Sequence, residues 1–130
     1  HMRKLRLLLV DDHEAFLAAA KRVLRKESSW LEVVGEALNG IQAIARCEEI
    51  KPDAVLMDMA MPEMGGIQAT RVIKAQDDPP FIIIASHFDD PERAGADAFV
   101  SKLCYAVDTL PHLKRLYAEV NNLSDAAQAQ

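Results

Sequence analysis

Residues 52–58 read Pro-Asp-Ala-Val-Leu-Met-Asp, and this stretch decides the fold. Pro52 ends the preceding element of secondary structure. After Asp53, four apolar residues form a run that stops on Asp58. A short apolar run without polar alternation is typical of a strand buried on both faces of a parallel sheet. A carboxylate that ends such a strand lies at the sheet edge where open α/β sheets bind their ligands.

Two further apolar runs also lead into charged residues. Residues 7–10, Leu-Leu-Leu-Val, lead into Asp11 and Asp12, and residues 98–100, Ala-Phe-Val, lead through Ser101 to Lys102. Neighbouring parallel strands end at one edge of the sheet, so these charges would meet there with Asp58. Three carboxylates and one ammonium would be costly in isolation, and the pattern therefore predicts a counter-ion and a functional role.

The rest of the chain alternates between strand and helix patterns. Further strands are predicted over 31–35 and 81–85, and helices over 14–24 with Asp12 as N-cap, from Asn39 to Pro52, and after Gly66. The last helix is predicted over 109–120, with Pro111 in its first turn. Alternation of this kind predicts an α/β fold with a five-stranded parallel sheet and right-handed crossovers.

One crossover is too short for this scheme. Sixteen steps along the chain separate Ser86 from Lys102 and must hold a strand exit, a helix, a turn and the fifth strand. A mean helix alone takes about 11 residues. Residues 89–95 leave room for about one helical turn. The fourth helix is therefore predicted to be shortened or missing.

Length and composition exclude several classes of protein. The chain has 130 residues, half of them hydrophobic, which fits one globular domain, predicted over 3–121. A net charge of −5 argues against direct nucleic-acid binding, and no apolar stretch approaches the roughly 20 residues of a membrane span. Cys47 and Cys104 match no zinc or disulfide pattern, which favours a cytoplasmic location. Residues 1–2 look like a cloning remnant, and 122–130 like a frayed tail or the start of a linker.

Taken together, four motifs resemble the response-regulator receiver domains of bacterial two-component signalling. They are residues 7–13 (LLLVDDH), 52–58 with Met61-Pro62 and Gly66, 83–86 (IIAS), and 95–102 (GADAFVSK). The opening Asp11-Asp12-His13 is similar to receivers of LuxR-type regulators. The resemblance implies a doubly wound, flavodoxin-like sheet of strand order 2-1-3-4-5 with helices on both faces.

The resemblance also implies a role for each site residue. Asp58 would accept a phosphoryl group from a sensor histidine kinase, with Mg²⁺ as cofactor. Asp11, Asp12 and the backbone carbonyl of Ala60 would bind the metal together with Asp58. Ser86, Phe99 and Lys102 would contact the phosphoryl group or switch with it. Such a domain catalyses only its own phosphorylation and dephosphorylation, forms homodimers in some cases, and controls transcription through an output domain that these residues do not include.

Other readings remain open at this stage. A stand-alone or degenerate receiver would act only as a protein-interaction module. A hydrolase of the haloacid dehalogenase type needs a second aspartate two positions after the nucleophile, where this chain has Ala60. A flavodoxin-like cofactor binder needs a phosphate-binding loop where Asp11 and Asp12 would repel phosphate. His13 and His87 are interpreted as capping or surface residues, although His87 narrows access to the site.

Overall fold

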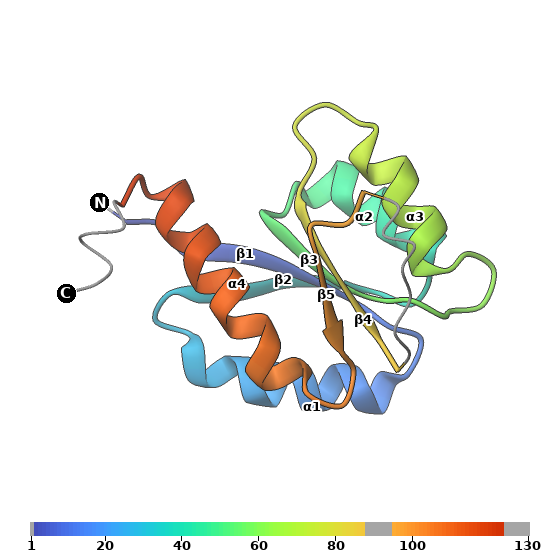
Figure 1. The fold of residues 1–130 in the computed structure, drawn as a ribbon, viewed down its shortest axis with the longest axis horizontal. Helices are drawn as coiled ribbons and strands as arrows, with labels where there is room; N and C mark the ends of the chain where they lie inside the picture. The colour runs from blue at the N-terminus through green and yellow to red at the C-terminus, as the bar shows by residue number, and fades with distance from the viewer. Residues whose placement is uncertain (1, 88–94, 124–130) are drawn as a thin grey trace.

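The computed structural model describes residues 2–87 and 95–123. Five parallel strands form one sheet in the order β2-β1-β3-β4-β5 (Figure 1). Both the parallel sheet and its strand order were predicted, and both are confirmed. The strands are β1 (Leu5–Val10), β2 (Leu31–Ala37), β3 (Ala54–Asp58), β4 (Phe81–Ser86) and β5 (Ala98–Ser101).

Helices cover both faces of the sheet. They are α1 (Glu14–Leu24), continued by the short 3₁₀-helix Arg25–Glu27, α2 (Gly40–Ile50), α3 (Gly66–Lys74) and α4 (Tyr105–Val120). α1 and α4 lie on one face, and α2 and α3 lie on the other (Figure 1). This arrangement is the doubly wound fold that the strand–helix alternation predicts.

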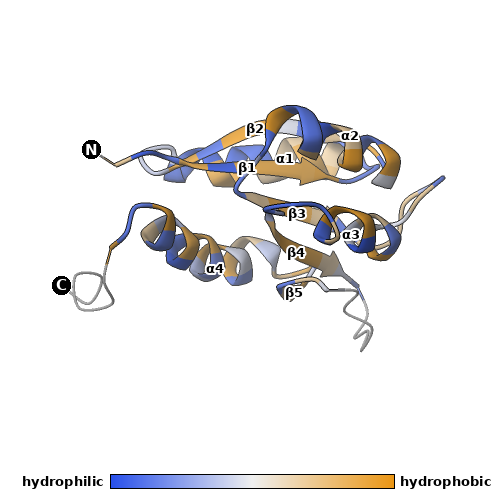
Figure 2. Cartoon of the chain, turned by 90° about the horizontal axis from the view of Figure 1, so that it is seen from above, coloured by the Kyte–Doolittle hydropathy of each residue, from blue (hydrophilic) through white to orange (hydrophobic). Residues whose placement is uncertain are grey.

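Two apolar cores result, because successive side chains of a strand point to opposite faces. In β1, Leu7 and Leu9 enter the core under α1 and α4, whereas Leu8 and Val10 enter the core under α2 and α3. The strands are largely apolar, while α4 alternates between apolar and hydrophilic residues (Figure 2). Each fully buried leucine contributes about 1.5–3 kcal/mol relative to an exposed one, so the central strands hold their ends firmly in place.

The prediction for the last helix is wrong at its start. α4 begins at Tyr105 rather than at residue 109, so Pro111 lies inside the helix and not in its first turn. The Cys104 carbonyl accepts bonds from the N–H groups of Val107 and Asp108 at 3.1 and 3.0 Å, which forms the extra turn. Pro111 removes the bond to the carbonyl of Val107, a residue exposed to solvent, so the loss is tolerated.

The predicted N-cap of the first helix is also wrong. His13, not Asp12, occupies the N-cap position, and its side chain makes no capping bond. Asp11 Oδ1 instead accepts the backbone N–H of His13 at 2.8 Å. Asp11 therefore fixes the loop between β1 and α1. Asp12 does not cap the helix and lies beside Asp58 at the carboxyl edge of the sheet.

The connection between β4 and β5 is described only in part. Most of the predicted short segment, residues 89–95, lies outside the described residues, which resume at Gly95. Within the described part of the chain, no helix lies between the two strands. Asp97 anchors the entry to β5, because its N–H donates to the Ile82 carbonyl and its carboxylate accepts from Ile82 N and Lys74 Nζ. None of the helices described is long and apolar enough to cross a membrane.

Candidate functional site

The carboxyl ends of three strands bring opposite charges together. Asp11 follows β1 and donates its N–H to the Ala37 carbonyl of β2 at 3.0 Å, and Asp58 is the last residue of β3. Lys102 follows β5, and its N–H donates to the Ser86 carbonyl at 2.8 Å. The backbone ladder thus places these side chains at one edge of the sheet, as the strand ends predict.

Lys102 lies between two buried carboxylates. Its Nζ is 2.7 Å from Asp11 Oδ2 and 3.3 Å from Asp58 Oδ2. Asp11 is 1 % exposed and Asp58 is 6 % exposed, so solvent screens these charges weakly. The same ammonium lies 4.6 Å from the centroid of the Phe16 ring, a cation–π contact that sequence reasoning did not anticipate. The Phe16 ring in turn packs at a tilt against Tyr105. The Phe16 ring therefore helps to confine Lys102 to the site.

Burial and charge shift the pKa values in this site. Burial raises the pKa of the Asp58 carboxyl, the Asp11 charge raises it further, and Lys102 offsets these effects only in part. Burial lowers the pKa of Lys102, but its bond to Asp11 and the charge of Asp58 outweigh burial, so that the net shift is upward. Lys102 therefore stays charged at neutral pH, while an ionised Asp58 lacks full compensation.

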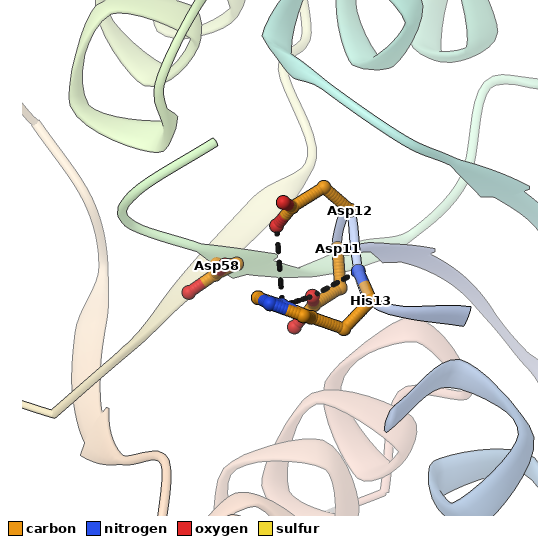
Figure 3. A group of neighbouring side chains, drawn as sticks. All are labelled: Asp11, Asp12, His13 and Asp58. Atoms are coloured by element: carbon orange, nitrogen blue, oxygen red, sulfur yellow. Dashed lines mark hydrogen bonds and ion pairs between the residues drawn. The ribbon is translucent and has the colours of Figure 1, made fainter. Parts of the chain in front are cut away.

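Four side chains offer ligand atoms for a cation. One atom each from Asp11, Asp12, His13 and Asp58 lies within 4.8 Å of the others (Figure 3). Asp12 Oδ1 is screened from solvent and lies 3.3 Å from His13 Nδ1. A set dominated by carboxylate oxygens fits a hard divalent cation such as Mg²⁺. Ala60 lies in the loop just beyond β3, two positions after Asp58.

The other predicted site residues occupy different positions. Ser86 ends β4, is 5 % exposed, and lies at the same edge as Asp58. Phe99 lies one strand further along, opposite Ile84, and packs half-buried against the core under α2 and α3. His87 follows Ser86 and is exposed. His13 is exposed and occupies the N-cap position of α1, as sequence reasoning expected. Its ring nitrogen also faces Asp11 and Asp12 (Figure 3), which sequence reasoning did not expect.

Gly66 sets the distance between α3 and the end of β3. Its N–H donates to the Met59 carbonyl at 2.8 Å. A Cβ atom at this position would meet the backbone carbonyl of Asp58 well under the 3.0 Å that real Cβ atoms keep. Only glycine allows this approach, so the first residue of α3 holds the backbone of Asp58 in place.

A doubly wound sheet with buried acids and one lysine at its carboxyl edge defines a class of α/β proteins. Within that class, the model of the response regulator receiver domain matches residues 7–114. The chain belongs to this family, and it is a receiver domain of the kind found in two-component response regulators. The resemblance read from the four motifs is thereby confirmed.

Several known proteins are similar to the chain. The response regulator UvrY of Escherichia coli K12 is 36 % identical over 94 % of this chain and 59 % of UvrY. The response regulator protein VraR of Staphylococcus aureus is 38 % identical over 80 % of this chain and 52 % of VraR. The crystal structure of a LuxR-family two-component response regulator from Aurantimonas superposes with a TM-score of 0.78 at 30 % identity, covering 89 % of this chain and 86 % of that one. The chain thus spans little more than half the length of these two curated relatives.

Proposed function

We propose that this receiver domain accepts a phosphoryl group on Asp58 from a sensor histidine kinase and changes its interaction surface in response. The observation that carries the proposal is the buried Asp58 carboxylate at the end of β3, paired with Lys102 and facing Asp11 and Asp12. A carboxylate held in this way is a fixed nucleophile for phosphoryl transfer, which depends mainly on positioning and charge neutralisation.

The acidic residues serve as a metal site in this proposal. Asp11, Asp12, Asp58 and the backbone carbonyl of Ala60 would hold Mg²⁺, which neutralises charge on the transferring phosphoryl group. The carboxylate oxygens of the three aspartates, which lie within 4.8 Å of one another, support this assignment. Asp58 provides the attacking oxygen, and Asp11 keeps Lys102 charged and oriented through its 2.7 Å contact.

The switch follows from the change in charge at Asp58. Phosphorylation adds about −1.5 to −2 charges with strong acceptor oxygens, so Lys102 and the hydroxyl of Ser86 bind the phosphoryl oxygens. Ser86 is buried at the same edge of the sheet as Asp58. Phe99 is half-buried on the neighbouring strand and moves into the space that Ser86 leaves.

We further propose that the domain spans residues 3–121, works in the cytoplasm and controls transcription through an output domain. The hydrogen bonds between Asn121 and Arg3 tie the two ends of the domain together and support its boundaries. The two free cysteines support the location. It catalyses only its own phosphorylation and dephosphorylation. A degenerate receiver that binds partners without phosphorylation is the second candidate.

Incubation with acetyl phosphate and Mg²⁺ separates these two candidates. The intact mass of the protein should rise by one phosphate, and EDTA should prevent the increase because the Asp58 site needs a cation. A mass that stays constant over a range of donor concentrations would favour the degenerate receiver.

Magnesium should also stabilise the folded protein. The carboxylates of Asp11, Asp12 and Asp58 repel one another, so a cation that binds only the folded state raises the unfolding temperature. Thermal melts with and without millimolar Mg²⁺ should differ for the wild type and coincide for Asp12→Ala. An equal Mg²⁺ effect in Asp12→Ala and the wild type would remove Asp12 from the metal site.

A homodimer also belongs to the proposal. Leu103, which follows Lys102 and precedes α4, and Val107 in the first turn of α4 are large apolar side chains that lie largely exposed. Burying them against a second copy after phosphorylation would link the site to assembly. Sedimentation of the phosphorylated and unphosphorylated protein tests this, and a monomer in both states at high concentration would exclude it.

A further inference from the structure

We infer that His13 adds a nitrogen ligand to the acidic site, so that the site binds Zn²⁺ and Co²⁺ more tightly than it binds Mg²⁺. The inference rests on the proposed metal site at Asp11 and Asp12 and specifies which cations that site selects. It gives His13, an exposed residue at the N-cap of α1, a role beyond capping or surface exposure.

The orientation of the His13 ring is the first observation. The side chain is 65 % exposed, yet its Nδ1 lies 3.1 Å from Asp11 Oδ1 and 3.3 Å from Asp12 Oδ1 (Figure 3). His13 is the N-cap residue of α1 and makes no capping bond, so its ring is not needed by the helix. The backbone N–H of His13 donates to Asp11 Oδ1 at 2.8 Å, which holds the two residues together.

The spacing of the three donor atoms is the second observation. Metal bonds of about 2.1 Å place neighbouring ligand atoms about 3.0 Å apart in an octahedron and about 3.4 Å apart in a tetrahedron. The His13 Nδ1 distances to Asp11 and Asp12, 3.1 and 3.3 Å, fall between these values. Asp12 Oδ1 is also screened from solvent, so His13 Nδ1 approaches it on the inner side of the loop. The His13 nitrogen therefore already lies at the spacing of a neighbouring ligand from each of the two carboxylate oxygens.

The chemistry of imidazole decides which cation gains from this arrangement. Mg²⁺ prefers oxygen ligands, whereas imidazole suits Zn²⁺ and the later first-row metals. Asp11 and Asp12 alone form an oxygen set, and His13 converts it into a mixed nitrogen–oxygen set. Because both kinds of cation would use Asp12, Zn²⁺ and Mg²⁺ would exclude each other from the site.

Calorimetric titration of His13→Phe with Co²⁺, Zn²⁺ and Mg²⁺ tests the inference. The background carries His1→Ala and Cys104→Ser, which remove a histidine at the chain start and an exposed thiol that would also bind these metals. His112→Phe is the matched control, because this histidine on α4 pairs with Arg115 instead of with carboxylates. The visible absorption of bound Co²⁺ reports nitrogen ligation directly.

We expect His13→Phe to weaken Co²⁺ and Zn²⁺ binding by about ten- to a hundredfold and to change the Co²⁺ spectrum. Mg²⁺ affinity should stay within about twofold, and His112→Phe should match the background protein. Undiminished Co²⁺ affinity in His13→Phe, with Mg²⁺ still bound, would overturn the role of His13 alone. A background protein that binds neither Mg²⁺ nor Co²⁺ would overturn the metal site itself and the inference with it.

Discussion

The Asp58→Asn protein will accept no phosphate, and in magnesium-free buffer at neutral pH it will unfold at a higher temperature than the wild type. Asparagine lacks the nucleophilic carboxylate but keeps the shape of the side chain. Burial and the Asp11 charge raise the pKa of Asp58, so its ionised form is less favourable in the folded protein than in the unfolded chain. Removing that charge therefore stabilises the fold, although Lys102 keeps only Asp11 as its partner.

The sign of this effect gives it a definite pH dependence. A carboxyl whose pKa is raised above its ordinary 3.8 binds its proton more tightly in the folded state than in the unfolded chain. The wild type therefore loses stability as pH rises from 3.8 to the raised pKa of Asp58. Thermal melts in EDTA should show little difference between the two proteins near pH 4 and a growing advantage of Asp58→Asn toward pH 7. A variant less stable than the wild type at pH 7 would contradict this account of the site.

Asp53→Asn is the matched control, for which we expect a change in stability of the opposite sign. Burial raises the pKa of Asp53, but its hydrogen bonds with the Arg3 side chain and the Arg6 backbone N–H more than offset burial, so the net shift is downward. Both Asp53 oxygens accept from Arg3 at 2.8 Å. The ionised form is therefore favoured in the folded state, and Asp53→Asn should lower the unfolding temperature at neutral pH.

Gly66→Ala will destabilise the domain and slow phosphorylation together. The new methyl group would collide with the backbone carbonyl of Asp58, and neither α3 nor β3 can yield without moving the acceptor residue. Forcing extra atoms into a packed site costs about 1–3 kcal/mol. Urea unfolding should show a loss of this size, and the initial rate of phosphorylation by acetyl phosphate should fall.

Gly35→Ala is the control that separates the effect of the position of Gly66 from the general effect of replacing a glycine by alanine. A Cβ at Gly35 meets the terminal methyl groups of Ile50 and Leu8, which are the far ends of flexible side chains. The domain should tolerate this change with a smaller loss of stability and an unchanged phosphorylation rate. Equal effects of the two substitutions on the rate would show that Gly66 does not position Asp58.

The backbone positions in the site could be predicted because strand ends are encoded locally. The apolar runs that end at Asp11 and Asp58 and lead to Lys102 must stop at one edge if the sheet is parallel, so the sequence places these charges together. The strand order was implied by the resemblance to receiver domains, since pairing between distant strands leaves no local signal.

Features that depend on side-chain direction and long-range packing could not be predicted. The ring of His13 turns toward Asp11 and Asp12 instead of capping α1, and a sequence carries no signal for that rotamer. Tyr105, the first residue of α4, packs on Phe16, a contact between residues far apart in the chain. The clash that makes Gly66 necessary appears only once α3 lies against β3.

Localisation of the phosphate tests the central claim most directly. The protein is incubated with acetyl phosphate and Mg²⁺, the acyl phosphate is reduced with borohydride, and the modified residue is identified by tandem mass spectrometry. The account predicts a single modified residue, Asp58, with no modification in Asp58→Asn or in EDTA. A phosphate on Asp11, Asp12 or any other residue, or one that persists in Asp58→Asn, would contradict it.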